Sequence, residues 1–309
     1  MISMSPESIS RAYNNRLLVP HFQDILRLWD ERSAQARDGL ASTGRAHWNL
    51  PYGPRPLNTL DLIQAEPDAQ EVADRRKTAQ PRTRPAAPIL FFIHGGYWRM
   101  LDKSAQTFIV PTWSARGAMV VIPNYSLAPA VTLADISLEV VQALAWVWRN
   151  AKRFGGDPQR IVVAGHSAGG HLTGMALSCL WPQLAPDLPP RMVTRGMAIS
   201  GLFDLDPLQH CEWLQPDIKL NGDRIAAWSP ARWKAPAGCE AVAVAGELES
   251  SEFHRQAALW RQAWGPKAVR AVESAPGRNH FDILFDLLDP QTVMYQHLER
   301  LLGLPKDGH

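Results

Sequence analysis

A five-residue motif of the form G-x-S-x-G, residues 165–169, constrains the fold of this chain more than any other stretch. The apolar run at residues 161–163 precedes it and is typical of a strand buried on both faces. Residues 171–180 follow with apolar side chains at helical spacing. Strand, motif and helix in succession predict a sharp turn that exposes Ser167 at the carboxyl end of the strand. The structural alternative is a glycine-rich turn with an incidental serine.

Glycine flanks this serine on both sides, at Gly165 and Gly169. In so tight a turn these positions have no room for a Cβ atom. The glycines therefore support the prediction of a turn that carries a nucleophile.

Size and charge restrict the class of protein. The chain has 309 residues, 46% of them hydrophobic, which suits one α/β domain with a large core. Its 32 basic and 30 acidic residues give a net charge of +2, so we expect no nucleic-acid or anionic-membrane partner. The first residues lack an apolar signal core, and no apolar run reaches transmembrane length. We expect a cytoplasmic protein, and a homodimer is one of the oligomeric states left open.

The cysteines argue against a disulfide framework or a zinc site. Cys179, Cys211 and Cys239 are odd in number, far apart and without C-x-x-C spacing. We expect them to be buried apolar residues. No metal or organic cofactor is predicted.

Strands and helices alternate along the chain, which predicts an α/β fold with a mostly parallel sheet and helices on both faces. Residues 1–46 are expected to form an N-terminal helical arm with Phe22, Ile25, Leu26 and Trp29 on one face. Residues 57–63 belong to a first hairpin, in which Leu60 and Leu62 alternate with Thr59 and Asp61. Residues 71–88 read as a charged surface loop, and residues 205–240 as a small lid-like insertion or ordinary rim packing. Further strands are predicted at residues 89–93, 118–122, 197–200, 241–245 and 268–273, and helices at 133–154, 171–180, 252–264 and 281–302.

A serine hydroxyl needs a base to remove its proton and an acid to orient that base. In hydrolases of this type the chain order is serine, acid, histidine. His280 is the best base, because it lies in a loop between the last predicted strand and a helix. His297 and His309 come later, in a terminal helix or tail. The acid should follow strand 241–245, where spacing alone leaves Glu247 and Glu249 open.

Glu252 also lies near this loop, but it more naturally begins the next helix, where a carboxylate complements the helix dipole.

An oxyanion needs fixed hydrogen-bond donors. The backbone N–H of Ala168 is one, because it follows the nucleophile. The loop after strand 89–93 is the second source, with Gly95 and Gly96 as donors. We expect His94 to brace this loop by hydrogen bonds rather than to take part in catalysis.

Five strings of residues resemble those of kynurenine formamidases, which are related to the hormone-sensitive-lipase-type esterases. They are His94-Gly-Gly-Tyr-Trp98, Gly165-His-Ser-Ala-Gly-Gly-His-Leu172, Gly201-Leu-Phe-Asp-Leu205, Glu249-Ser-Ser-Glu-Phe-His-Arg-Gln256 and Asn279-His-Phe-Asp282. The likeness also includes Tyr13-Asn-Asn-Arg16 and Leu50-Pro-Tyr-Gly53. The first two strings are shared with many esterases, whereas the fourth is more selective.

The resemblance implies an α/β-hydrolase fold and hydrolysis of N-formyl-L-kynurenine to L-kynurenine and formate. It implies Ser167 as nucleophile, His280 as base and Glu249 as acid, without metal or cofactor. Glu249 replaces the aspartate of animal members, and Ser251 replaces a proline.

The substrate is open. Similar sequences also resemble general carboxylesterases and aryl-ester or carbamate hydrolases, so a small aromatic amide or ester is expected. Tyr97, Trp98 and Tyr125 are candidates to stack on an aromatic ring or to wall the pocket. Arg99 is a candidate partner for a substrate carboxylate, or a solvated surface residue. Acyl transfer to an alcohol and a non-catalytic binding protein on this fold are the remaining alternatives.

Overall fold

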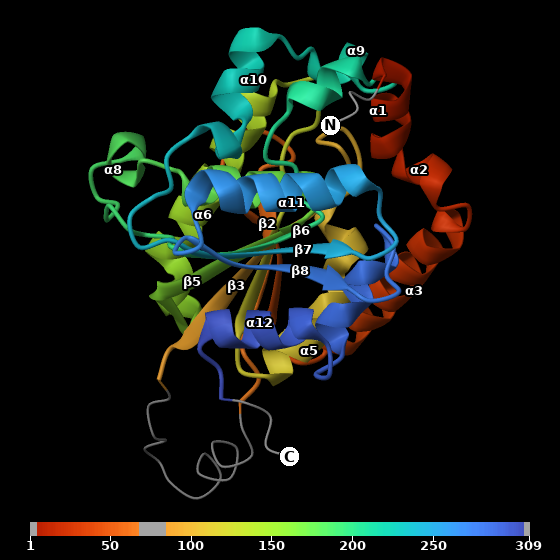
Figure 1. Cartoon of the computed structure of the whole chain (residues 1–309). Coiled ribbons are helices and arrows are strands. Elements are labelled where there is room, and N and C mark those ends of the chain that lie inside the picture. Colours follow the sequence, from red (N-terminus) through yellow and green to blue (C-terminus); the bar gives the residue numbers. More distant parts are fainter. Residues whose placement is uncertain (1–4, 68–84, 306–309) are drawn as a thin grey trace, which may run out of the picture.

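A computed structural model describes residues 5–67 and 85–305 of the chain (Figure 1). Most of the surface loop expected at residues 71–88 lies outside the described residues, as does His309. The end of that expected loop belongs to a strand, because β3 already begins at Ala87.

Within the described residues, eight strands form one sheet in the order β1-β2-β4-β3-β5-β6-β7-β8. The pairs β1–β2 and β2–β4 are antiparallel, and all the other neighbours are parallel. The sheet confirms the predicted α/β class and its first hairpin. The strands are β1 (Ala46–Pro51), β2 (Thr59–Ile63), β3 (Ala87–Ile93), β4 (Met119–Pro123), β5 (Gly156–His166), β6 (Arg195–Ile199), β7 (Glu240–Gly246) and β8 (Val269–Ala275).

Helices cover both faces of the sheet, and each face has its own apolar core (Figure 1). One face packs against α6 (Leu133–Asn150), α7 (Ala168–Leu177) and α11 (Ser251–Trp264). The other packs against α3 (Phe22–Ala41), α5 (Val110–Ala115) and α12 (Val293–Leu302).

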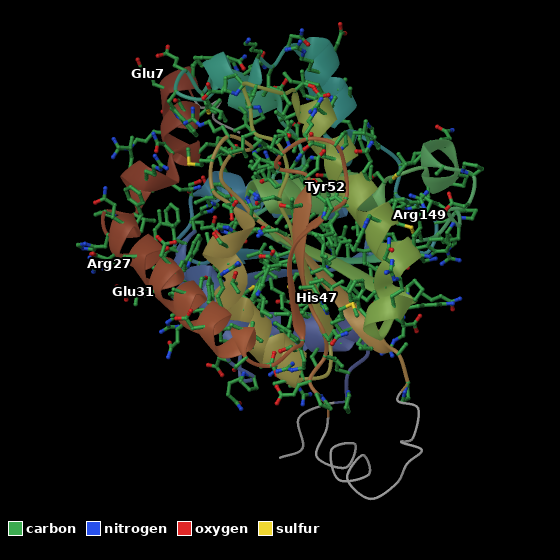
Figure 2. The ribbon with its side chains drawn as sticks, turned by 180° about the vertical axis from the view of Figure 1, so that it is seen from behind. Glu7, Arg27, Glu31, His47, Tyr52 and Arg149 are labelled. Atoms are coloured by element: carbon green, nitrogen blue, oxygen red, sulfur yellow. The ribbon has the colours of Figure 1, made fainter. Side chains whose placement is uncertain are left out.

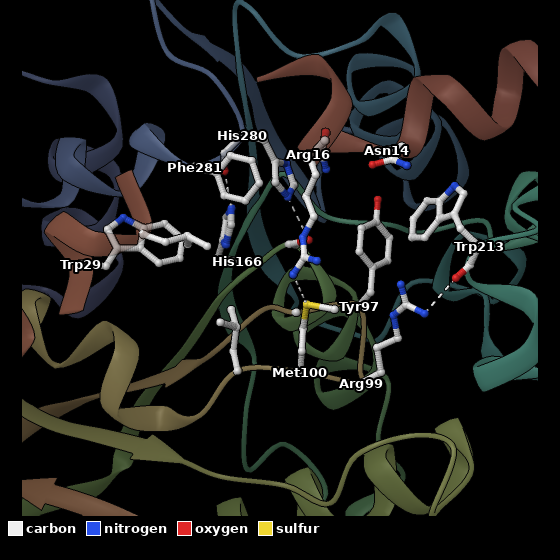
Figure 3. A pocket seen from close by; sticks show the side chains of 15 residues that line it. Asn14, Arg16, Trp29, Tyr97, Arg99, Met100, His166, Trp213, His280 and Phe281 are labelled. Atoms are coloured by element: carbon white, nitrogen blue, oxygen red, sulfur yellow. Dashed lines mark hydrogen bonds between the residues drawn. The ribbon is translucent and has the colours of Figure 1, made fainter. Parts of the chain in front are cut away.

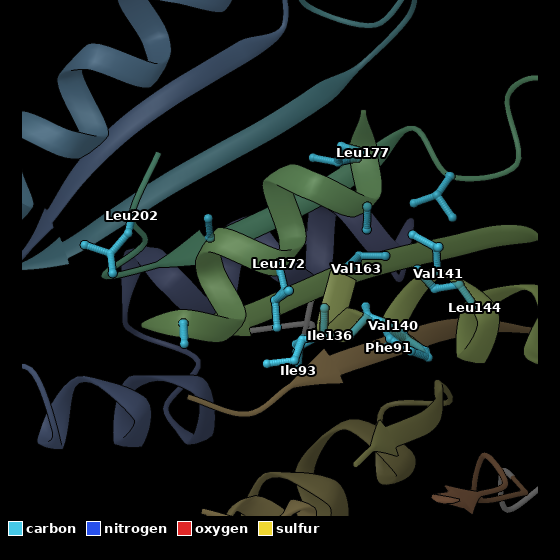
Figure 4. Packing of buried hydrophobic residues seen from close by; sticks show 14 of the residues in the cluster. Phe91, Ile93, Ile136, Val140, Val141, Leu144, Val163, Leu172, Leu177 and Leu202 are labelled. Atoms are coloured by element: carbon cyan, nitrogen blue, oxygen red, sulfur yellow. The ribbon is translucent and has the colours of Figure 1, made fainter. Parts of the chain in front are cut away.

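Helix α7, which follows the serine motif, packs on a buried apolar cluster (Figure 4). Leu172 of α7 packs in one cluster with Val163 of β5 and with Ile136 and Val140 of α6, all almost fully buried. Burying each such side chain contributes roughly 1.5–3 kcal/mol. The turn between β5 and α7 is therefore held between two well-packed elements.

Helix α3 provides the apolar face expected of the N-terminal arm. Trp29 is buried on its inner side, and Ile25 and Leu26 are partly buried. Arg27 and Glu31 project outward from the same helix and form an exposed ion pair (Figure 2). This amphipathic pattern docks α3 on the sheet.

The alternation expected in β2 is only partly right, because Asp61 is buried rather than exposed. Its carboxylate pairs with Lys103 at 3.0 Å and with Arg37 at 3.0 Å. A buried carboxylate needs such partners, and the sequence alone does not reveal residues so distant along the chain.

Several helix boundaries differ from the prediction. The predicted helix 133–154 is an α-helix only up to Asn150 and continues as a 3₁₀ helix, and α7 ends at Leu177 rather than at residue 180. Helix α7 begins at Ala168 rather than His171, because Gly169 and Gly170 are helical despite their low propensity. The predicted helix 281–302 is two elements, η5 and α12, separated around Pro290. The remaining elements are α1 (Pro6–Tyr13), α2 (Asn15–Leu18), α8 (Trp181–Leu184), α9 (Gln215–Ile218) and α10 (Gly222–Trp228), with the 3₁₀ helices η1 (Lys103–Ile109), η2 (Ala151–Phe154), η3 (Asp206–His210), η4 (Pro230–Arg232) and η5 (Asp282–Leu288).

Residues 205–240 form the short elements η3, α9, α10 and η4, which gather with α1 above the sheet (Figure 1). Leu208, Leu214 and Ile225 anchor them in the core. Over the described part of the chain, no helix combines the length and apolar character needed to cross a bilayer.

Candidate active site

Ser167 lies at the turn between β5 and α7 with φ 57° and ψ −116°. A Cβ on Gly165 would lie 2.2 Å from the carbonyl oxygen of Gly169, and a Cβ on Gly169 would lie 2.0 Å from that of Ile93. Both contacts are impossible, so glycine is required on each side of the serine. The positive φ of Ser167 is the strained conformation expected of a nucleophile-bearing turn.

His280 meets Ser167 across the carboxyl end of the sheet. Its Nε2 atom lies 3.1 Å from Ser167 Oγ, and the two residues are 4% and 2% exposed. His280 follows β8 in the chain, and the rings of Phe253 and Phe281 lie 4.8 and 5.4 Å from its imidazole. The base is thus enclosed by aromatic side chains and faces the serine.

Glu249 lies on the other side of His280. Its Oε2 atom is 2.7 Å from His280 Nδ1, which places a proton on that nitrogen and leaves Nε2 as an acceptor toward Ser167. Its Oε1 atom accepts hydrogen bonds from Ser200 Oγ at 2.6 Å and from the Gly246 N–H at 2.7 Å. The carboxylate is buried, and all its observed partners are donors.

The sequence analysis did not find Ser200. Its position at the end of β6 could have indicated it. Strand β6 lies beside β7, and the carboxyl ends of neighbouring parallel strands lie together.

The acid and base loops are joined directly. The Leu248 N–H donates to the Arg278 carbonyl at 2.9 Å, and Glu247 accepts from the Gly277 N–H at 2.7 Å. A Cβ on Gly246 would lie 2.4 Å from the Arg278 carbonyl oxygen, so this glycine permits the close approach. Glu247, the competing acid, therefore contacts the histidine loop and not the histidine ring.

The third glutamate, Glu252, lies in the first turn of α11, as expected. It accepts hydrogen bonds from Tyr13 and Arg255 at 2.8 Å each. Burial raises the pKa of its carboxyl, but these donors outweigh it and hold the pKa below its usual value. This contact fastens α1 of the arm to α11.

The loop after β3 is braced from behind. Tyr125 Oη donates to the carbonyl oxygens of His94 at 2.9 Å and Gly95 at 3.3 Å, and its ring stacks on His94 at 4.2 Å. In a trans peptide the N–H points away from the carbonyl. The N–H groups of Gly95 and Gly96 therefore point away from Tyr125. His94 also bonds the Gly95 carbonyl at 2.8 Å, which agrees with a bracing role.

Two structural features bear on the candidate oxyanion hole. A Cβ on Gly95 would lie 3.1 Å from Ser167 Cβ, so the loop touches the serine turn. Ala168 is the first residue of α7, where backbone N–H groups have no partner within the helix. The N–H groups of Gly95, Gly96 and Ala168 remain candidate donors of the oxyanion hole.

A cavity of about 200 Å³ opens in front of Ser167 and His280 (Figure 3). Trp29, His166 and Phe281 lie on one side of it, and Asn14, Tyr97, Arg99 and Trp213 on the other (Figure 3). The remaining lining residues are Asn15, Arg16, Leu26, Gly96, Met100 and Leu101. The wall thus combines aromatic rings with amide and guanidinium groups, a composition typical of small-molecule sites.

Only one of the three aromatic residues predicted for this pocket lines it. Tyr97 does, with its hydroxyl donating to the Tyr13 carbonyl at 2.5 Å. Trp98 and Tyr125 are buried and are not among the residues that line the cavity, so the structure gives no support for either of the roles expected of them, stacking on an aromatic ring or walling the pocket. Trp98 Nε1 donates to His171 Nδ1 at 3.2 Å instead.

Two histidines near the site are held neutral. His171 Nε2 bonds the Trp228 carbonyl at 2.7 Å, and burial lowers the pKa of His171 to about 4. Burial also lowers the pKa of His166 far below its usual value, and its Nε2 bonds the His280 carbonyl at 2.7 Å. His166 therefore supports the backbone of the base loop.

Arg99 lines the cavity, but its charge is already balanced. It forms an ion pair with Asp217 and donates to the Trp213 carbonyl at 2.8 Å. Because Arg99 already has an anionic partner, the structure does not support the prediction that it pairs with a substrate carboxylate.

In the part of the chain that the structure describes, no group of three or more His, Cys, Asp or Glu residues is arranged to hold a metal ion. The three cysteines are free thiols, with Cys211 and Cys239 buried and Cys179 partly buried. Ser167, His280 and Glu249 form a continuous chain of hydrogen bonds. Through this chain the imidazole can take the serine proton and give it to a leaving group.

Comparison with known proteins agrees with this geometry. A family model for the alpha/beta hydrolase fold matches residues 90–207. The kynurenine formamidase of Danio rerio is 24% identical, over 97% of this chain and 98% of that protein. The kynurenine formamidase of Drosophila melanogaster is 29% identical, over 66% of this chain and 69% of its own.

Solved structures show the same fold. A candidate thioesterase from Silicibacter sp. TM1040 has a TM-score of 0.76 and 27% identity, covering 93% of this chain and 97% of its own. The esterase of Pyrobaculum calidifontis has a TM-score of 0.60 and 18% identity, covering 91% of each chain. The chain is therefore a hydrolase with the α/β-hydrolase fold, similar to kynurenine formamidases and related to esterases.

Proposed function

We propose that the protein is a serine hydrolase that cleaves aryl formamides, with N-formyl-L-kynurenine as the expected substrate. The observation that carries the proposal is the buried chain of contacts Ser167–His280–Glu249, which opens on a cavity with aromatic walls. Similarity to kynurenine formamidase over nearly the whole chain supports the choice of a formamide.

In the first half of the reaction, Ser167 Oγ attacks the formyl carbon while His280 Nε2 takes its proton. Glu249 stabilises the resulting imidazolium through Nδ1. In this proposal the N–H groups of Gly95, Gly96 and Ala168 donate to the oxyanion. Nε2 then protonates the aniline nitrogen, the C–N bond breaks and kynurenine leaves.

In the second half, water attacks the formyl-serine ester. His280 takes a proton from this water and returns it to Ser167 Oγ as formate is released. The cycle needs no group beyond water and the residues named.

The test compares kcat/KM for N-formyl-L-kynurenine with kcat/KM for p-nitrophenyl acetate and butyrate. Ser167→Ala is the control and should lose at least about 10³-fold on every substrate. A much larger value for the formamide supports the proposal. Rapid ester cleavage with negligible formamide turnover would contradict the proposed substrate but would still agree with the serine mechanism. Near-normal turnover by Ser167→Ala contradicts the mechanism itself.

A general carboxylesterase is the second candidate. Esterase LipQ of Mycobacterium tuberculosis is 32% identical over 60% of this chain, although the match spans only 45% of LipQ. The same serine, base and donors would cleave an ester, so only substrate selectivity separates the two candidates.

A further inference from the structure

One wall of the cavity carries hydrogen-bond donors without suitable acceptors. Asn15 is only 4% exposed and lines the cavity, yet its Nδ2 group has no hydrogen-bond partner among the described residues. A buried amide donor without a partner costs roughly 1–3 kcal/mol. Such a group is expected to meet an acceptor when a ligand is bound.

Arg16, the next residue, is bonded to a neutral group. Its Nη2 group donates to the thioether sulfur of Met100 at 2.9 Å, and its guanidinium lies 5.6 Å from the Phe22 ring. Among the described residues, no carboxylate forms an ion pair with Arg16. A thioether is a weak acceptor, so an oxygen anion would be a better partner for this cation.

The charged residues that line the cavity are positive. The lining residues include Arg16 and Arg99 but no aspartate or glutamate. Arg99 forms an ion pair with Asp217, which lies outside the cavity lining, whereas Arg16, a solvent-exposed residue of the lining, pairs with no carboxylate among the described residues. Figure 3 shows the Arg16 side chain extending toward Met100, and Arg16 lines the same cavity as Ser167 and His280.

We propose that Arg16 and Asn15 form a subsite for a carboxylate carried by the leaving group of the substrate. The two oxygens of a carboxylate can accept from the guanidinium and from the Asn15 amide together. This inference rests on the proposed function and adds a substrate preference to it. The enzyme favours aryl amides or esters whose leaving group carries a carboxylate over the same compounds in which that carboxylate is esterified. Arg16 and Asn15 come from the N-terminal arm, so the arm determines selectivity.

The test measures a ratio. For wild type and Arg16→Gln, kcat/KM is measured with N-formyl-L-kynurenine and with its methyl ester, which lacks the carboxylate charge. Arg16→Gln should lower the ratio of kcat/KM for the free acid to kcat/KM for the methyl ester about tenfold, and Arg16→Lys should lower this ratio less. Arg11→Gln is the matched control, because Arg11 is an exposed arm arginine that does not line the cavity. It should leave the ratio unchanged.

A second measurement is independent of formamide turnover. L-kynurenine and its methyl ester are tested as inhibitors of p-nitrophenyl acetate hydrolysis. Wild type should bind the free acid more tightly, and Arg16→Gln should remove about tenfold of that preference.

The two proposals can fail separately. If formamides are not cleaved but the inhibition preference depends on Arg16, the subsite stands and the proposed substrate falls. If formamides are cleaved but Arg16→Gln changes both members of each pair equally, or neither, the subsite is wrong and the function stands. Absence of inhibition by L-kynurenine also overturns the subsite.

Discussion

Ser200 Oγ lies 2.6 Å from Glu249 Oε1, so the end of β6 holds the carboxylate that faces His280. The hydroxyl donates to one carboxylate oxygen and leaves the other free for the imidazole. Ser200 itself has a φ of 51°, a strained conformation for a non-glycine residue. This geometry makes Ser200 a positioning residue that acts through Glu249.

Ser200→Ala should lower kcat about tenfold with little change in KM, because the acid loses an orienting hydrogen bond of the charge-assisted kind. The measurement is steady-state kinetics with the best substrate. Ser178→Ala is the control, since its hydroxyl bonds only the Gly174 carbonyl of α7. Equal effects of both variants would contradict a role through Glu249.

Glu249→Gln should lower kcat by about 10³-fold or more, because an amide favours the wrong imidazole tautomer and cannot stabilise the imidazolium. Glu249→Asp should retain more activity, although its carboxylate is one methylene shorter. Glu247→Gln should lose about threefold or less, since Glu247 contacts Gly277 and not the His280 ring. Comparable losses in the Glu247 and Glu249 variants would refute the assignment of the acid.

Gly169→Ala should destabilise the protein by about 3 kcal/mol, because the new Cβ would lie 2.0 Å from the Ile93 carbonyl oxygen. Gly39→Ala is the opposite case, since a Cβ there meets nothing within 4 Å and the residue lies in α3. It should stabilise by about 0.5–1 kcal/mol. Urea unfolding measures both changes, and a stable Gly169→Ala protein would show that the turn can relax.

Acid should weaken the fold through its buried histidines. The pKa of His171 is about 4 in the folded protein, against a usual value of 6.5, because burial disfavours its charged form. Between those values the unfolded chain binds a proton that the folded chain does not. Stability is therefore complete above pH 6.5 and is lost as pH falls toward 4, by about 3 kcal/mol for this group.

His171→Gln keeps side-chain groups that can bond Trp98 and Trp228 but removes the titration. The free energy of unfolding, measured between pH 7 and 4.5, should fall less steeply in this variant than in wild type. Parallel curves for the two proteins would assign the acid sensitivity elsewhere, first to His94, whose pKa burial also lowers to about 4.

Local sequence patterns predicted much of the fold. The apolar runs marked the parallel strands, and the spacing around Ser167 marked the turn between β5 and α7. These signals are local because burial on both faces and tight turns restrict the residue types at each position. The sequence also placed His280 and Glu249 in loops that the structure brings to Ser167.

The other features depend on contacts between distant segments. Trp98 and Tyr125 follow strand ends, as pocket residues often do, yet both side chains point into the core. The segment that carries Asn15 and Arg16 is held at the cavity by contacts with distant residues, among them the hydrogen bond from Tyr13 to Glu252, a residue 239 positions later. No local pattern in either segment encodes that contact.

The contact between Tyr13 and Glu252 also bears on the order of events during synthesis. The arm leaves the ribosome early, but its anchor on α11 and His280, the proposed base, emerge only after the turn that carries Ser167 and most of the sheet. Ser167 therefore has no proton acceptor, and the cavity no complete wall, while the nascent chain is still being extended. In the proposed mechanism, Ser167 can therefore become a nucleophile only after both late segments have been synthesised.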